Sequence, residues 1–93
     1  MRIIEQRASI EVCTEAGWEA YDLLTEQPLS DEDIEALRHL GGSFLYLRQL
    51  RKPFFKLEAH NFILKGVRGD CFFRMAVHRE HLAELDRVRN TFM

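Results

Sequence analysis

Apolar and polar residues alternate along most of the segment 43–78, and this pattern limits the fold more than any other feature of the sequence. Successive side chains of a β-strand point to opposite faces, so a period of two indicates strands with one face turned toward a core. The clearest run is FFKLEAH, in which Phe55, Leu57 and Ala59 share one face. The segment is therefore predicted to form an antiparallel meander of three or four strands.

Turn residues divide this segment. Residues 51–53 end in a proline and read as one turn, and Gly69-Asp70 suits a two-residue hairpin turn. Between them, His60-Asn61 indicates either a third turn or a bulge within one long bent strand. The number of strands depends on that choice, which the sequence leaves open.

A short helix is predicted over residues 31–40. Ser30 is a good N-cap residue, and three acidic residues follow it in the first turn, where they complement the helix dipole. Gly41 suits the position after the helix C-terminus. The apolar stripe of this helix is narrow, so we expect an amphipathic helix that lies on a core.

Apolar and small residues also recur at steps of three and four near the N-terminus. These residues are Ile10, Cys13, Gly17, Ala20 or Tyr21, and Leu24. This spacing predicts a helix over residues 14–25, with Trp18, Tyr21 and Leu24 in a row that packs in the core. For residues 2–12 a helix competes with a β-strand, because β-branched residues alternate there with polar ones.

The C-terminal segment carries apolar residues at helical spacing. They are Leu82, Leu85, Val88 and Phe92. A helix is predicted here, with this stripe packed against one face of the sheet. The whole fold is then α+β: N-terminal helices, an antiparallel meander of three or four strands over about 43–78, and a C-terminal helix, arranged as a two-layer sandwich.

Length and composition point to one domain over residues 1–93. No apolar run is long enough for a membrane span, and Glu5 and Arg7 stand where a signal peptide needs apolar residues, so we expect a cytoplasmic protein. Cys13 and Cys71 are far apart and have no metal-ligand spacing. We expect buried, reduced thiols, with a disulfide between them as the alternative.

Charge is distributed unevenly along the chain. Residues 1–42 hold 3 Lys and Arg against 10 Asp and Glu, whereas residues 43–79 hold 8 against 2. The basic segment also contains all phenylalanines except Phe92. A segment that is both cationic and aromatic indicates a binding surface on the sheet face that the helices leave open.

Simple alternation assigns seven residues to this surface. They are Phe44, Tyr46, Arg48, Phe54, Lys56, Phe72 and Arg74. We expect them to contact a protein, most simply a second copy of the chain in a homodimer formed through the sheet face or a strand edge. The alternative is single-stranded RNA or DNA, whose bases stack on aromatic rings, although the sequence lacks the aromatic signature of RNA-recognition sheets.

Catalytic and metal-binding patterns are not evident. His78 and His81 are three residues apart with His60 on a neighbouring predicted strand, but they straddle a strand end and a helix start, which does not match a zinc motif. No cofactor loop is present, and neither cysteine has a predicted base beside it. The sequence predicts a non-catalytic interaction module without metal or cofactor, and an enzyme or small-ligand site ranks third.

Overall fold

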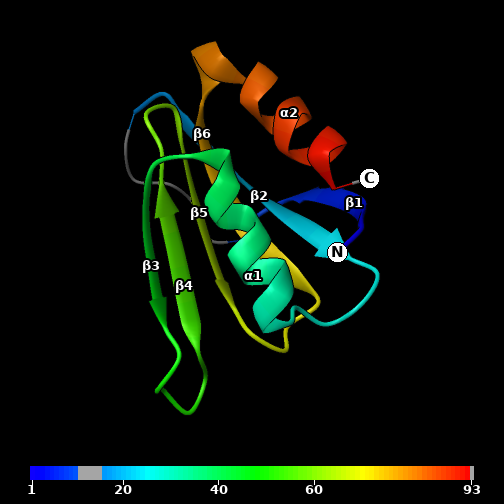
Figure 1. Ribbon diagram of the computed structural model, residues 1–93. Helices are drawn as coiled ribbons and strands as arrows, with labels where there is room; N and C mark the ends of the chain where they lie inside the picture. Colours follow the sequence, from blue (N-terminus) through cyan, green and yellow to red (C-terminus); the bar gives the residue numbers. More distant parts are fainter. Residues whose placement is uncertain (11–15, 93) are drawn as a thin grey trace.

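The computed structural model describes residues 1–10 and 16–92. Over these residues the chain forms one six-stranded antiparallel sheet with helices on a single face (Figure 1). In order across the sheet, the strands are β1 (Ile3–Ala8), β2 (Trp18–Thr25), β6 (Phe72–His78), β5 (Phe62–Val67), β4 (Phe54–Glu58) and β3 (Ser43–Leu47). The predicted fold, with N-terminal helices and a sheet of three or four strands, is wrong.

Two α-helices in the described residues cover the same face of the sheet (Figure 1). The first, α1 (Asp31–Leu37), continues into a 3-10 turn at Arg38–Leu40, and the second, α2 (Ala83–Thr91), follows a 3-10 turn at Arg79–His81. No helix in the described ranges is long and apolar enough to cross a lipid bilayer.

The start of α1 confirms the capping prediction. The Asp33 backbone N–H donates to the Ser30 side chain, and the Ser30 backbone N–H donates to the Asp33 carboxylate, which forms a capping box. Ile34 and Leu37 are buried, so the predicted narrow stripe does face the core. The helix proper ends at Leu37, before the predicted end at residue 40.

The main correction concerns residues 14–25, which were predicted as a helix. Residues 18–25 are instead strand β2, which pairs with β1 on one side and β6 on the other. Leu23 is fully buried, whereas Ile10, a member of the apparent helical stripe, is 98% exposed. Cys13, another member, lies outside the described residues. The recurrence of apolar residues at steps of three and four did not reflect a helix. Backbone pairing with β1 and β6 determined the structure of residues 18–25.

The strands predicted from the alternation of apolar and polar residues are confirmed more fully. Residues 3–8 form strand β1, so for these residues the strand is correct and the helix is not. The segment 43–78 contains four strands. His60-Asn61 lies in a turn, closed by a hydrogen bond of 2.9 Å from the Ala59 backbone N–H to the Phe62 carbonyl oxygen. The β5–β6 turn is longer than the predicted two residues, because β5 ends at Val67 and β6 begins at Phe72.

A single core lies between the helices and the covered sheet face. Its fully buried side chains with the largest volumes are Phe55, Phe62, Phe73, Leu23, Leu29, Ile34, Leu37, Leu57, Leu64, Met75, Val77 and Val88. The C-terminal helix contributes Leu85 and Val88 as predicted, but Leu82 is 41% exposed. Cys71 was predicted to be buried and is exposed, because it lies in the β5–β6 turn, before β6 enters the core.

Neighbouring leucines test the face assignment of β2. Leu23→Ala removes a fully buried side chain and should destabilise the fold by about 2 to 5 kcal/mol. Leu24→Ala changes a half-buried side chain on the other face and should cost about 1 kcal/mol. Urea unfolding followed by circular dichroism measures both. An equal or larger loss for Leu24→Ala would contradict the assignment.

Candidate functional site

The sheet face opposite the helices carries a row of charged residues at one level across five strands. The strand register places Lys56 opposite Lys65, Lys65 opposite Arg74, Arg74 opposite Asp22, and Asp22 opposite Arg7. On β4, β5 and β6 the alternate residues Phe55, Leu64 and Phe73 face the core. The open face therefore presents three adjacent cations, followed by one acid and a further cation.

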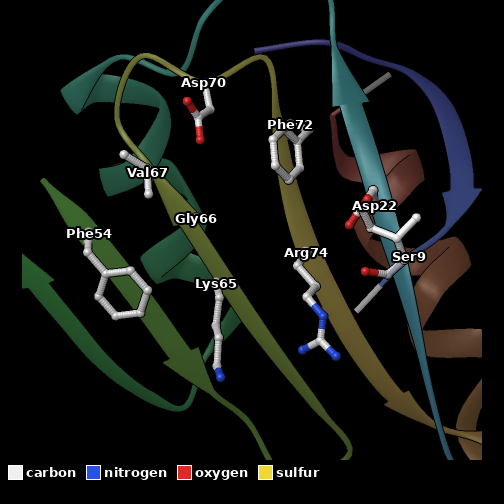
Figure 2. A pocket seen from close by; sticks show the side chains of 10 residues that line it. Ser9, Asp22, Phe54, Lys65, Gly66, Val67, Asp70, Phe72 and Arg74 are labelled. Carbon is white, nitrogen blue, oxygen red and sulfur yellow. The ribbon is translucent and has the colours of Figure 1, made fainter. Parts of the chain in front are cut away.

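A shallow groove of about 540 Å³ lies on this face. Figure 2 shows the side chains of Lys65 and Arg74 next to each other on β5 and β6, with the Phe54 and Phe72 rings on either side of β5. Phe72 is 41% exposed and the other three side chains are half-buried. The groove thus combines apolar walls with two basic residues, Lys65 and Arg74, and two acidic residues, Asp22 and Asp70.

Carboxylates neutralise part of this face. The Lys56 ammonium lies 2.5 Å from the Glu58 carboxylate, and its hydrogen bond lowers the pKa of Glu58. Arg7 forms an ion pair with Glu5 on the same strand. The open face is therefore mixed in charge.

The structure divides the seven predicted site residues between the two faces. Four lie on the open face: Phe54, Lys56, Phe72 and Arg74. The other three face the helices: Phe44 and Tyr46 pack against the core, and Arg48 pairs with Glu35 of α1. The seven residues do not form one surface, and a role in binding stays a prediction for each of them.

Two of the three residues on the helix side, Tyr46 and Arg48, belong to a polar network that ties β3 to α1. The Tyr46 hydroxyl donates a hydrogen bond to Asp31, and this bond is the main cause of the lowered pKa of Asp31. Arg68 adds a contact of 3.3 Å to the same carboxylate. The Arg48 guanidinium lies 4.9 Å from the centre of the Tyr46 ring, a cation–π distance.

The two edges of the sheet differ. At β1 the register shifts between Ile3 and Glu5, charged side chains follow, and the Ile3 backbone N–H donates to the Phe92 carbonyl oxygen at 2.9 Å. At β3 the register with β4 is regular over all five residues, SFLYL, which include no charge and no proline. Leu45 in its centre is 50% exposed.

Two of the histidines considered as metal ligands lie close together. The His78 and His81 rings lie 5.9 Å apart, and His78 also packs at 5.9 Å against the edge of Trp18. Within residues 1–10 and 16–92 no group of three metal-ligating side chains comes together. Trp18 was predicted to pack in the core and is half-buried beside His78.

Sequence reasoning missed three residues of these surfaces. Lys65 could have been found from the alternation with Phe62 and Leu64, whereas Asp22 was hidden by the mistaken helix. Alternation that puts Phe44 and Tyr46 on the open face puts Leu45 on the core side, whereas the pairing of Leu45 with Lys56 shows that it lies on the open face. No family model matches the sequence, and neither does any curated protein or solved structure. Function must be inferred from the surfaces themselves.

The hydrogen bond between Tyr46 and Asp31 gives a prediction about pH. A lowered carboxyl pKa stabilises the fold above the unfolded pKa, and this stability is lost as pH falls through the folded pKa. Tyr46→Phe removes the donor, so the pKa of Asp31 should rise toward its unfolded value, and the variant should lose less stability on acidification than the unsubstituted chain. Carbon-detected NMR titration of the carboxyl group measures the pKa. Tyr21→Phe, which removes a hydroxyl bonded to Glu19, is the control, and an unchanged Asp31 pKa in Tyr46→Phe would refute the assignment.

Proposed function

We propose that this chain is a small, non-catalytic cytoplasmic protein-interaction module that pairs with a second copy of itself through the outer edge of β3. The unprotected state of this edge is the observation that carries the proposal. An edge strand presents unpaired backbone N–H and C=O groups, and proteins usually protect it with bulges, charges or proline. Among the described residues β1 has a register shift and charges, whereas β3 has none of these features. The exposed free thiol of Cys71 suits a reducing compartment.

Symmetric pairing of two β3 strands suits the sequence of the strand. An antiparallel pair with full overlap places Leu45 of one copy opposite Leu45 of the other, and Phe44 opposite Tyr46. Each such cross-strand pair contributes about 0.2 to 1 kcal/mol. No charges oppose one another within the paired strands, because residues 43–47 are uncharged. The two sheets would become one continuous sheet around a two-fold axis.

Charged residues beside β3 predict how the stability of the dimer should depend on salt. Arg38 lies 4.7 Å from the centre of the Phe44 ring, and Arg48 lies 4.9 Å from that of Tyr46. Glu35 contacts both guanidinium groups, so each copy keeps one excess positive charge here. Since Phe44 of one copy faces Tyr46 of the other, the dimer brings like charges together.

Salt should therefore strengthen self-association by screening this repulsion. Sedimentation equilibrium in about 20 mM and about 300 mM sodium chloride, between which the Debye length falls about fourfold, measures the effect. A dimer that dissociates as salt is added would contradict the proposed arrangement of Arg38 and Arg48.

Matched lysine substitutions at the two edges test the interface. Leu45→Lys places a charge in the centre of β3 at a position that is 50% exposed, so the fold should persist while the dimer dissociates. Ile4→Lys makes a similar change on β1, at a position that is 58% exposed, and should leave the dimer intact. Sedimentation velocity over a concentration series compares both with the unsubstituted chain. A strict monomer at high micromolar concentration, or equal effects of the two substitutions, would refute the proposal.

Single-stranded nucleic acid, the alternative partner, has weaker support. Phe44, Tyr46 and Arg48 contact the helix side, and the open face carries Glu58 and Asp22 beside its cations. Binding to nucleic acid weakens as salt rises, so its salt dependence is opposite to that expected for the β3 dimer.

A further inference from the structure

We infer that the β3 dimer binds one small divalent oxyanion, of the sulfate or phosphate type, on its two-fold axis, and that this anion strengthens dimerisation. The inference rests on the self-association proposed above and adds a ligand to the same interface. Its basis is a cluster of arginines on the helix side of β3, which the carboxylates of a single copy neutralise only in part. The dimer would bring two such clusters together.

The net charge of this cluster follows from its ion pairs. Arg38 and Arg48 share the carboxylate of Glu35, from which Arg38 lies at 3.3 Å. Arg68 pairs with Asp31 at 3.3 Å and adds no net charge. Within residues 1–10 and 16–92 no other carboxylate forms an ion pair with these three arginines, so one positive charge is left in each copy.

Aromatic rings hold both unshared arginines next to the strand that would form the interface. The Arg38 guanidinium lies 4.7 Å from the centre of the Phe44 ring, and the Arg48 guanidinium lies 4.9 Å from that of Tyr46. Both rings are half-buried and pack against the core on the helix side of β3. The two cations are therefore positioned before a second copy binds, which lowers the cost of ordering them in a site.

The two-fold axis of the proposed dimer joins the clusters of both copies. With Leu45 opposite Leu45, the Phe44 side chain of one copy lies opposite Tyr46 of the other, at about 5 Å between Cβ atoms. Each of these rings carries an arginine, so four guanidinium groups and two Glu35 carboxylates would surround the axis on the helix face. Two excess positive charges would then lie close together, and association without a ligand would have to overcome their repulsion.

A divalent oxyanion matches this arrangement in charge and in hydrogen bonding. Its two negative charges equal the excess positive charge of the two copies, and its oxygens can accept paired N–H groups of arginine from both sides. Chloride, which has one charge and no such geometry, screens the repulsion without bridging the copies. Because the site needs arginines from both copies, the oxyanion binds the dimer in preference to the monomer and stabilises it.

Sedimentation equilibrium at one fixed ionic strength separates specific binding from screening. Sodium sulfate replaces sodium chloride stepwise up to about 10 mM, so that the Debye length stays constant, and sodium phosphate is used in a second series. We expect the dissociation constant of the dimer to fall about tenfold with at least one oxyanion. For one anion per dimer, this constant should become inversely proportional to the oxyanion concentration as the site fills.

Two arginine variants serve as test and control. Arg48→Gln removes the excess charge, so its dimer should form more tightly in chloride alone, and its response to the oxyanion should fall below about twofold. Arg87→Gln makes the same change in net charge on α2, at an arginine that pairs with Glu84 and lies 5.6 Å from the centre of the Phe62 ring. This control should dimerise and respond to the oxyanion as the unsubstituted chain does.

The possible results separate the anion site from the dimer itself. A dimer whose dissociation constant is the same in chloride and in both oxyanions would overturn the anion site without affecting the β3 interface. Equal responses of Arg48→Gln and Arg87→Gln to the oxyanion would also overturn the site. A chain that stays monomeric in every buffer would refute the interface and the site together.

Discussion

Backbone hydrogen bonding across the sheet is the constraint on which the other features depend. Strands β2, β6, β5 and β4 pair on both sides, so their polar backbone groups are satisfied within the sheet. The helices α1 and α2 cover a face and supply the core, but a helix on a face leaves the edges unpaired. At β1 the irregular register and the contact from Ile3 to Phe92 reduce the capacity for further pairing. In the described structure the edge of β3 keeps that capacity, and for this reason we place the interface there.

The edge of β3 and the groove on the open face use different parts of the sheet. Self-association uses the backbone groups and uncharged side chains of β3, whereas the groove uses side chains of β4, β5 and β6. A two-fold axis perpendicular to the joined sheets would keep the helices of both copies on one face. Both grooves would then open on the opposite face. Such a dimer would present two equivalent grooves on one broad surface.

Local pattern predicted the elements whose burial has one clear face, and it failed where burial depends on distant partners. Strands β3 to β6 and the capped start of α1 were predicted, but β2 was not. Leu24 is partly buried on the open face, so apolar residues occur on both faces of β2 and imitate a helical stripe. The register between strands decides which predicted site residues share a face, and this explains why only part of the predicted site lies on the open face. Phe44 pairs with Leu57 and not with Phe54, so the two phenylalanines lie on opposite faces. This register is set by the length of the β3–β4 turn, which alternation within each strand does not reveal.

Contacts between differently labelled copies test the account most directly. In a sample that mixes isotope-labelled and unlabelled protein, isotope-filtered NOE spectra report only contacts between chains. The account predicts such contacts between Phe44 of one copy and Tyr46 of the other, and between the two Leu45 side chains. Contacts between chains that arise instead from β1 or from the open face, or none at concentrations where the chain is dimeric, would contradict it.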